Sequence, residues 1–204
     1  MKKTIWIILS VVAVFFLKVA LGQGNLYLSN IGEPSGGSSA VASDAWIAQG
    51  FQTGTNPGGY ALNSIQLLMV PPSGSPNGFT VLTYVQTIPR TLIGPDPTVG
   101  GVFTYTASDI LLSPSTGYYV GVRATTPVAQ GAFRWSEATT FTHNSGDGWS
   151  FFSFYLSSTD GTSWQVHPDP PFQLAIQATA VPEPAICALA GLFLSALLVR
   201  KKLK

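Results

Sequence analysis

Between residues 45 and 180, short runs of alternating apolar and polar residues are separated by clusters of Gly, Pro, Asn and Asp. A period of two is typical of strands with one buried face, and these four residue types form the turns between strands. No stretch of ten or more residues in this region has the apolar period of an amphipathic helix. The pattern therefore predicts an all-β domain.

The pattern also predicts where the strands lie. Residues 107–112 fit either a helical turn or an edge strand. Residues 23–44 are rich in Gly and Ser, and we expect them to form a flexible segment before the domain. We expect an antiparallel β-sandwich of jelly-roll type over residues 45–180. The predicted strands are 45–52, 60–70, 79–87, 102–106, 118–124, 132–136, 149–156, 162–166 and 172–180, with turns at 77–78 and 158–161.

The first 22 residues have a different pattern. Lys2 and Lys3 precede an apolar run over 5–17, and Ala20 and Gly22 supply the small residues that signal peptidase requires. The sequence predicts a signal peptide over 1–22, cleaved before Gln23. The alternative is an uncleaved N-terminal anchor.

The last 24 residues, 181–204, form a second such segment. Val181-Pro182-Glu183-Pro184 is followed by an uncharged apolar run over 185–199. A helix of that length covers about 22 Å, which is marginal for a hydrocarbon core of about 30 Å. Positive charge after a span favours the cytoplasmic side, so a transmembrane helix is expected with the domain outside. The basic end is Arg200, Lys201, Lys202 and Lys204.

The order of Pro182-Glu183-Pro184, short apolar helix and basic end closely resembles the PEP-CTERM sorting signal of Gram-negative bacteria. The resemblance implies an exosortase as partner, which recognises the Pro-Glu-Pro motif, and transit through the inner membrane to the cell surface or extracellular matrix. Lone Cys187 is interpreted as a small apolar residue of the helix. The alternative is a plain membrane anchor.

The distribution of charged residues along the chain limits the kinds of partner that it can bind. The whole chain has a formal charge of +1, but seven of its ten basic residues lie in the terminal segments. The region 23–180 has three arginines against eight acidic residues, a net charge of −5. Nucleic acid requires a basic surface, so it is excluded as a partner. The region also lacks cysteine, and we expect it to be stabilised by its apolar core without disulfides.

Catalytic motifs are missing from the sequence. There is no Gly-x-Ser-x-Gly elbow, no phosphate-binding glycine loop and no zinc motif, and the histidines, His143 and His167, are 24 residues apart. A shared metal site for them is a minor alternative to two loop positions, with His167 stacked in a turn of 168–171.

Carboxylates offer two further alternatives. A pair of them could hydrolyse glycosides, and Asp147 and Asp160 could bind calcium, but most lie beside Gly, Ser or Pro, where a carboxylate caps a turn. Glu137 fits a turn least, and Arg134 or Arg123 would explain it as an ion-pair partner. The candidates are Asp44, Asp109, Glu137, Asp147, Asp160 and Asp169.

Aromatic residues provide the remaining candidates for binding. Exposed rings stack on sugars, whereas Trp at strand centres fills sandwich cores. Trp149 and Trp164 lie beside turn residues, and we expect them to be partly exposed and available to a carbohydrate.

Four short segments resemble the choice-of-anchor R ectodomains over roughly residues 45–180. They are Gly50-Phe51-Gln52-Thr53-Gly54, the run from Gly59 to Ile65, Thr116-Gly117-Tyr118-Tyr119-Val120, and Asp160-Gly161-Thr162-Ser163-Trp164. The resemblance implies a surface β-domain without an established catalytic activity. We therefore expect a non-catalytic exported protein associated with extracellular polysaccharide or biofilm matrix. A carbohydrate-binding module is the main alternative and a glycan-acting enzyme the weaker one.

Overall fold

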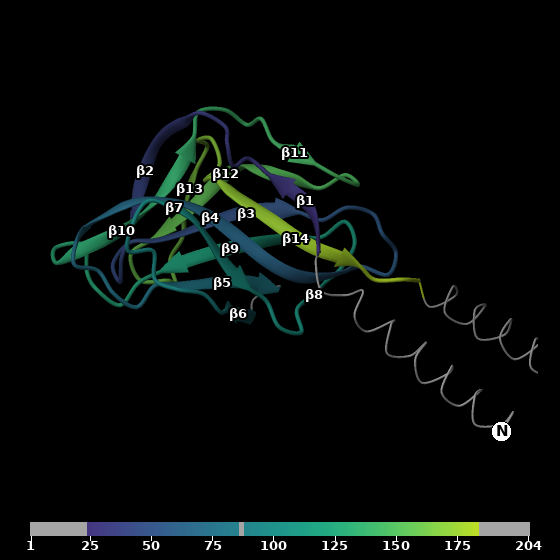
Figure 1. Ribbon diagram of the computed structural model, residues 1–204, viewed down its shortest axis with the longest axis horizontal. Coiled ribbons are helices and arrows are strands. Elements are labelled where there is room, and N and C mark those ends of the chain that lie inside the picture. Colours follow the sequence, from purple (N-terminus) through teal and green to yellow (C-terminus); the bar gives the residue numbers. More distant parts are fainter. Residues whose placement is uncertain (1–23, 86–87, 184–204) are drawn as a thin grey trace, which may run out of the picture.

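The computed structural model describes residues 24–85 and 88–183, and all regular structure in these residues is β. The strands form two antiparallel sheets (Figure 1). The expectation of an all-β, sandwich-like domain is confirmed. The predicted signal peptide, with Ala20, Gly22 and Gln23, and the tail from Pro184 through Lys204 lie outside the described residues. Within the described ranges, no helix is long and apolar enough to cross a membrane.

One sheet has eight strands in the order β11-β1-β14-β4-β10-β2, and β7 and β8 also pair with β4. β4 is the longest strand and pairs with β14 from Leu67 back to Tyr60. The strands are β1 (Asn25–Ser29), β2 (Ser35–Val41), β4 (Tyr60–Gly74), β7 (Gly101–Thr106), β8 (Leu111–Leu112), β10 (Gly131–Ala138), β11 (Asn144–Ser145) and β14 (Leu174–Ala180).

The second sheet has six strands in the order β13-β12-β3-β9-β5-β6. We call it the six-stranded sheet. Its strands are β3 (Trp46–Gln52), β5 (Thr80–Val85), β6 (Ile88–Leu92), β9 (Gly117–Arg123), β12 (Ser150–Ser158) and β13 (Gln165–His167).

The core lies between the two sheets because each strand turns alternate side chains inward. In β9, Tyr118, Val120 and Val122 are buried. Phe51 of the six-stranded sheet stacks on Trp149, which also stacks on Tyr27 of the other sheet. One continuous apolar cluster therefore joins the sheets without a disulfide in the described residues.

The expected flexible segment over 23–44 is wrong. It contains β1 and β2, and Leu28 in β1 is fully buried. β2 pairs along β10 from Val41 opposite Phe133 to Ser35 opposite Ala138. Gly and Ser obscure the strand pattern in β2, but their backbone groups still complete the sheet ladder.

Other strand boundaries also differ from the predicted ones. The predicted strand over 60–70 is longer in the structure, where β4 continues to Gly74. The edge-strand interpretation of 107–112 is confirmed only for β8. The register between β4 and β10 passes from Val70 opposite Arg134 to Ser73 opposite Ala132. Pro71 and Pro72 lie inside this irregularity, where a missing N–H does not break a ladder bond.

The two ends of the described domain lie together. Asn25 pairs with Ala178, so β1 begins beside the end of β14, at one end of the molecule (Figure 1). β3 begins at the opposite end of the sandwich with Trp46. It runs toward the end where the chain leaves, because Gly54, just after β3, lies against Tyr60, which pairs with Ala180 of β14. The sandwich therefore has a chain-exit end and a far end.

Candidate functional site

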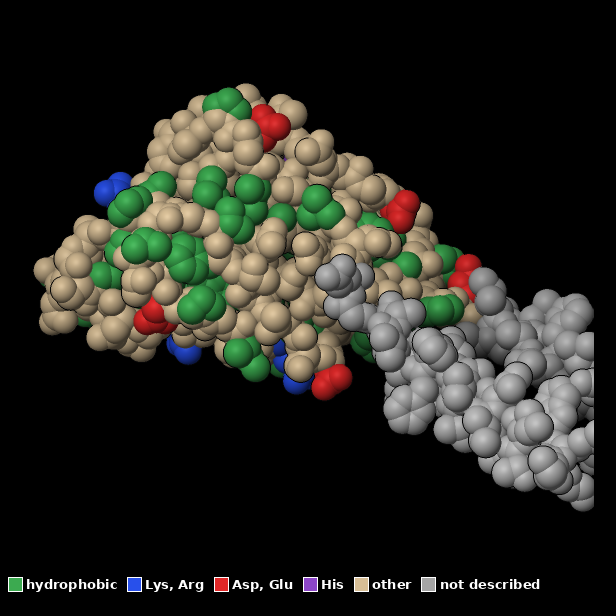
Figure 2. Space-filling view, in the orientation of Figure 1, with side chains coloured by type: hydrophobic (Ala, Val, Ile, Leu, Met, Phe, Trp, Pro, Cys, Tyr) green, Lys and Arg blue, Asp and Glu red, His purple; other side chains and the backbone are tan. Residues whose placement is uncertain are grey.

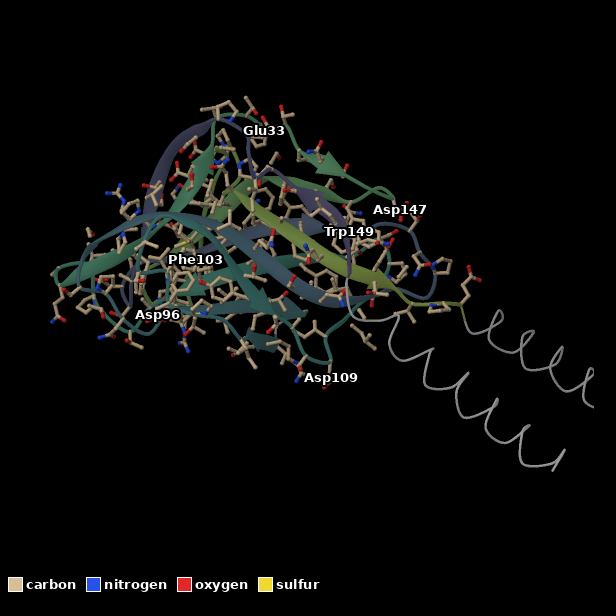
Figure 3. The ribbon with its side chains drawn as sticks, in the orientation of Figure 1. Glu33, Asp96, Phe103, Asp109, Asp147 and Trp149 are labelled. Atoms are coloured by element: carbon tan, nitrogen blue, oxygen red, sulfur yellow. The ribbon has the colours of Figure 1, made fainter. Side chains whose placement is uncertain are left out.

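Trp149 does not contribute to a surface site. Its side chain is 1% exposed, so the expectation of partial exposure is wrong. Gly148, at φ 78°, turns the chain before β12, and the indole then packs among Tyr27, Phe51 and Tyr60 (Figure 3). Four aromatic rings stabilise one another here, which makes Trp149 a core residue.

Trp164 is half-buried and lies at the far end of the sandwich. The segment after β12 turns at Asp160-Gly161, as predicted, and folds across the outer face of the six-stranded sheet. Gly161 lies against the ring of Trp46, and Trp164 meets Tyr84 edge to face at 6.5 Å. The turn therefore places Trp164 over strands that are distant in the sheet order.

Asp160 holds this turn in shape. Its carboxylate accepts hydrogen bonds from the backbone N–H groups of Thr162 and Ser163, each at 2.8 Å, and from the Ser158 hydroxyl at 3.0 Å. The backbone donors lower the pKa of Asp160 well below its ordinary value because they favour the charged carboxylate. The turn-capping interpretation of Asp160 is confirmed.

A cleft of about 420 Å³ opens beside this turn. It lies where β2, at the edge of the eight-stranded sheet, faces β12 and β13, at the edge of the other sheet. We call it the far-end cleft. Its lining combines aromatic, hydroxyl, amide and carboxylate groups: Ser39, Asp44, Trp46, Tyr155, Ser157, Ser158, Ser163, Trp164, Gln165 and His167 are among its residues.

Tyr155 and His167 form the inner wall of the far-end cleft. Their rings stack at 4.7 Å between centroids, and His167 Nε2 is 2.8 Å from the Ser157 hydroxyl. His167 lies in β13, so its expected stacking in the proline turn is wrong. Burial first, and then the charges of Glu137 and Asp169, raise the pKa of Tyr155 and keep its hydroxyl neutral.

The remaining carboxylates do not gather into one site. In Figure 3, Asp109 and Asp147 lie toward the chain-exit end, and Asp96 lies toward the other. Asp44 accepts the N–H of Val128 at 2.9 Å, which caps a loop as predicted. Asp109 and Asp147 have positive φ angles of 55° and 52°, as expected for turn residues.

Glu137 and the arginines have other partners than those expected. Glu137 accepts a hydrogen bond from Ser39, beside the far-end cleft. Arg134 Nε donates to the Ser38 hydroxyl at 3.1 Å, and Arg123 lies 4.8 Å from the ring centroid of Trp46. The expected ion pairs for Glu137 are therefore replaced by a hydroxyl contact.

Asp147 and Asp160 cannot share a calcium ion. The nine residues of β12 separate them, and the strand spans about 26 Å at roughly 3.3 Å per residue. Among the described residues, no group of three His, Cys, Asp or Glu side chains is arranged to hold a metal.

The chemistry of the far-end cleft suits an uncharged, hydroxyl-rich ligand. Aromatic faces pack against C–H groups, while Ser, Gln and His side chains exchange hydrogen bonds with hydroxyls. The surface is poor in charge, and Figure 2 shows charged groups scattered singly over the face it presents. Sequence reasoning singled out Trp164 but did not group it with Trp46, Tyr155 and His167, because no local signal indicates that β2 lies beside β13.

The chain matches no protein-family model, no curated protein and no solved structure.

Proposed function

We propose that this chain is a non-catalytic exported protein, sorted to the outer surface of a Gram-negative bacterium through its C-terminal tail. Signal peptidase would cleave before Gln23, and an exosortase would process the Pro182-Glu183-Pro184 motif. We also propose that the sandwich is a jelly roll and that it lies between a signal peptide and a transmembrane helix. The extracellular polysaccharide or biofilm matrix is the proposed setting.

The observation that supports sorting is the place where the chain leaves the domain. Gly24 and Val181 lie at the same end, because β1 and β14 pair antiparallel with Asn25 opposite Ala178. Both terminal signals would then face the same membrane, while the far end of the sandwich points away from it. This arrangement suits a domain that is exported, held briefly at the membrane and then processed.

Intact-mass spectrometry of the protein recovered from its native cell surface tests the proposal. A chain that begins at Gln23 and ends near 181–184 is expected. Replacing Pro182, Glu183 and Pro184 with alanine should leave the apolar helix and Lys204 attached. Unchanged processing of this variant would contradict sorting through the motif, and a native mass that retains Lys204 would reduce the tail to an anchor.

A second candidate function is carbohydrate binding, and the far-end cleft favours it. The cleft combines half-buried Trp164 with the stacked pair Tyr155 and His167 and with several hydroxyls. A glycan array with the full chain in detergent tests this function. Binding should weaken for Trp164→Ala and His167→Ala, and an array without any binding would remove the candidate.

A further inference from the structure

The outer face of the six-stranded sheet carries a row of aromatic side chains. We call it the aromatic strip: Phe152 and Phe154 of β12, Tyr119 of β9, Tyr84 of β5, and Trp164 from the turn. Phe152 stacks with Phe154 at 5.4 Å and meets Tyr119 edge to face at 5.6 Å. Tyr119 is directly opposite Tyr84, which meets Trp164. The strip therefore crosses the strands as one continuous row.

Glycines in the central strands make room for these rings. A side chain at Gly50 would overlap Phe152, and Cβ atoms at Gly117 and Gly121 would come within 2.8 Å of Phe152 and 2.7 Å of Tyr84. The rings of Phe152 and Tyr84 consequently lie on the backbone, in contact with the sheet on one side. All five aromatic side chains are half-buried, so the strip stays open to solvent on its other side.

An irregularity in β12 directs the two phenylalanines outward. Against β3, Phe151 is opposite Phe51 and Tyr155 opposite Gln49, so three residues of β12 face the single residue Gly50. Such bulges re-aim side chains and often lie beside functional sites. Here the bulge brings Phe152 and Phe154 to the same face, while Phe151 and Tyr155 turn toward the interior.

We infer that the aromatic strip is a binding surface for a neutral polysaccharide chain. The inference rests on the proposed carbohydrate-binding function and names a surface that shares only Trp164 with the far-end cleft. Sugar rings would pack their C–H groups against those aromatic faces of the strip that are open to solvent, one after another across the sheet, with the Tyr84 and Tyr119 hydroxyls as hydrogen-bond partners.

Charge selects a neutral chain as the occupant. No carboxylate lies among the side chains that β3, β5, β9 and β12 turn to this face, and Arg123, stacked on Trp46, is their one charged group. The domain as a whole carries a net charge of −5, which repels anionic polymers. A neutral polysaccharide needs no charged partner on this face, and the negative charge of the domain does not repel it. Burial raises the pKa of Tyr84 and of Tyr119, so both hydroxyls stay protonated donors.

The aromatic strip and the far-end cleft can be tested separately. The strip lies on the outer face of β12, whereas Tyr155, which stacks on His167, turns to the inner side. Phe152→Ala and Tyr119→Ala change only the strip, and His167→Ala changes only the cleft. Leu111→Ala, in β8, is the matched control, because it truncates a well-exposed apolar residue on the other sheet.

The experiment is affinity electrophoresis of the full chain in detergent, through gels that contain hydroxyethyl cellulose, galactomannan or the anionic polymer alginate. We expect retardation in at least one neutral gel and none in alginate. Phe152→Ala and Tyr119→Ala should each weaken the affinity about tenfold, while Leu111→Ala leaves it unchanged. Urea titration shows that each variant is folded.

Three outcomes would overturn the inference. Retardation lost with His167→Ala and kept with Phe152→Ala would assign binding to the cleft, so that the carbohydrate-binding function stands without the strip. Absence of retardation in both neutral gels would remove the strip as a site for neutral polysaccharide. A dimer in sedimentation that becomes monomeric with Phe152→Ala would make the strip a contact between copies of this chain.

Discussion

At the scale of single residues, position within the strand decides what each aromatic side chain does. Phe51 and Tyr118 point inward and are fully buried, while their neighbours in sequence, Gly50 and Tyr119, lie on the outer face. A one-residue step thus separates a core ring from a surface ring. The two tryptophans singled out as candidate ligands divide in the same way, with Trp149 in the core and Trp164 at the surface.

The tryptophans should therefore separate stability from binding. Trp149→Ala removes a ring packed against three others and is expected to lower the free energy of unfolding by about 3–5 kcal/mol. Trp164→Ala, at a half-buried site, should cost less than about 2 kcal/mol and should weaken glycan binding. Urea denaturation and the glycan array measure the two effects. Equal destabilisation by both variants would contradict the difference in burial.

Asp160 makes the stability of the far-end turn sensitive to acid. Its pKa is lowered from 3.8 by backbone donors, so the charged form stabilises the folded state above the ordinary pKa. This contribution should be lost as pH falls below 3.8 and through the lowered folded-state pKa. Asp160→Asn keeps an acceptor oxygen without this titration. Its unfolding free energy should depend less steeply on pH between about 4 and 2. Parallel pH profiles of both proteins would contradict the prediction.

At the scale of elements, regular alternation predicts the strands that have a clear apolar face but misses those that form by pairing with a distant strand. β9 and β14 follow from their apolar period, but β2 contains no large apolar residue before Val41. It forms because β10 offers it a free edge, and such a long-range pairing leaves no local signal. For the same reason Trp164 could be found from the sequence, while the cleft between β2 and β13 could not.

A short turn fastens the base of the C-terminal tail to the domain. The Val181 N–H donates to Gly59 O at 3.0 Å, and Asn56 Nδ2 donates to Val181 O at 3.0 Å. A Cβ at Gly58 would overlap the Val181 carbonyl oxygen. Because a protease needs free, extended backbone, the bonds around Val181 should be protected, and tail removal should occur beyond Pro182.

Gly58→Ala is expected to detach Val181 and to spread the cleavage positions toward the domain. Gly146→Ala is the matched control, since its Cβ would meet only Tyr27, at an ordinary 3.8 Å. Intact masses of the processed proteins measure the position of the new C-terminus. A Gly58→Ala product with the wild-type end would show that the turn does not set the cleavage position. Uncleaved protein in every case would instead count against tail processing itself.

At the scale of the whole molecule, the two ends of the sandwich have different roles. The chain enters and leaves at one end, where Asn25 pairs with Ala178, and the far-end cleft and Trp164 lie at the other. A tail that holds the protein at a membrane would present the cleft outward. The aromatic strip, which lies along one side of the sandwich, would then be reachable by a polymer that runs parallel to the cell surface.

The orientation of the domain relative to the membrane can be measured with introduced cysteines, because the only cysteine of the chain is Cys187, in the tail. Ser163 and Ser113 are both exposed, the first at the far-end turn and the second beside β8 at the chain-exit end. In a Cys187→Ala background, Ser163→Cys should react quickly with a large, membrane-impermeant maleimide on intact cells. Ser113→Cys should react more slowly as long as the tail is retained, because the membrane blocks the reagent. In detergent the two rates should become equal. Equal rates on cells would mean that the domain lies on its side or is already released, and the outward presentation of the cleft would be wrong.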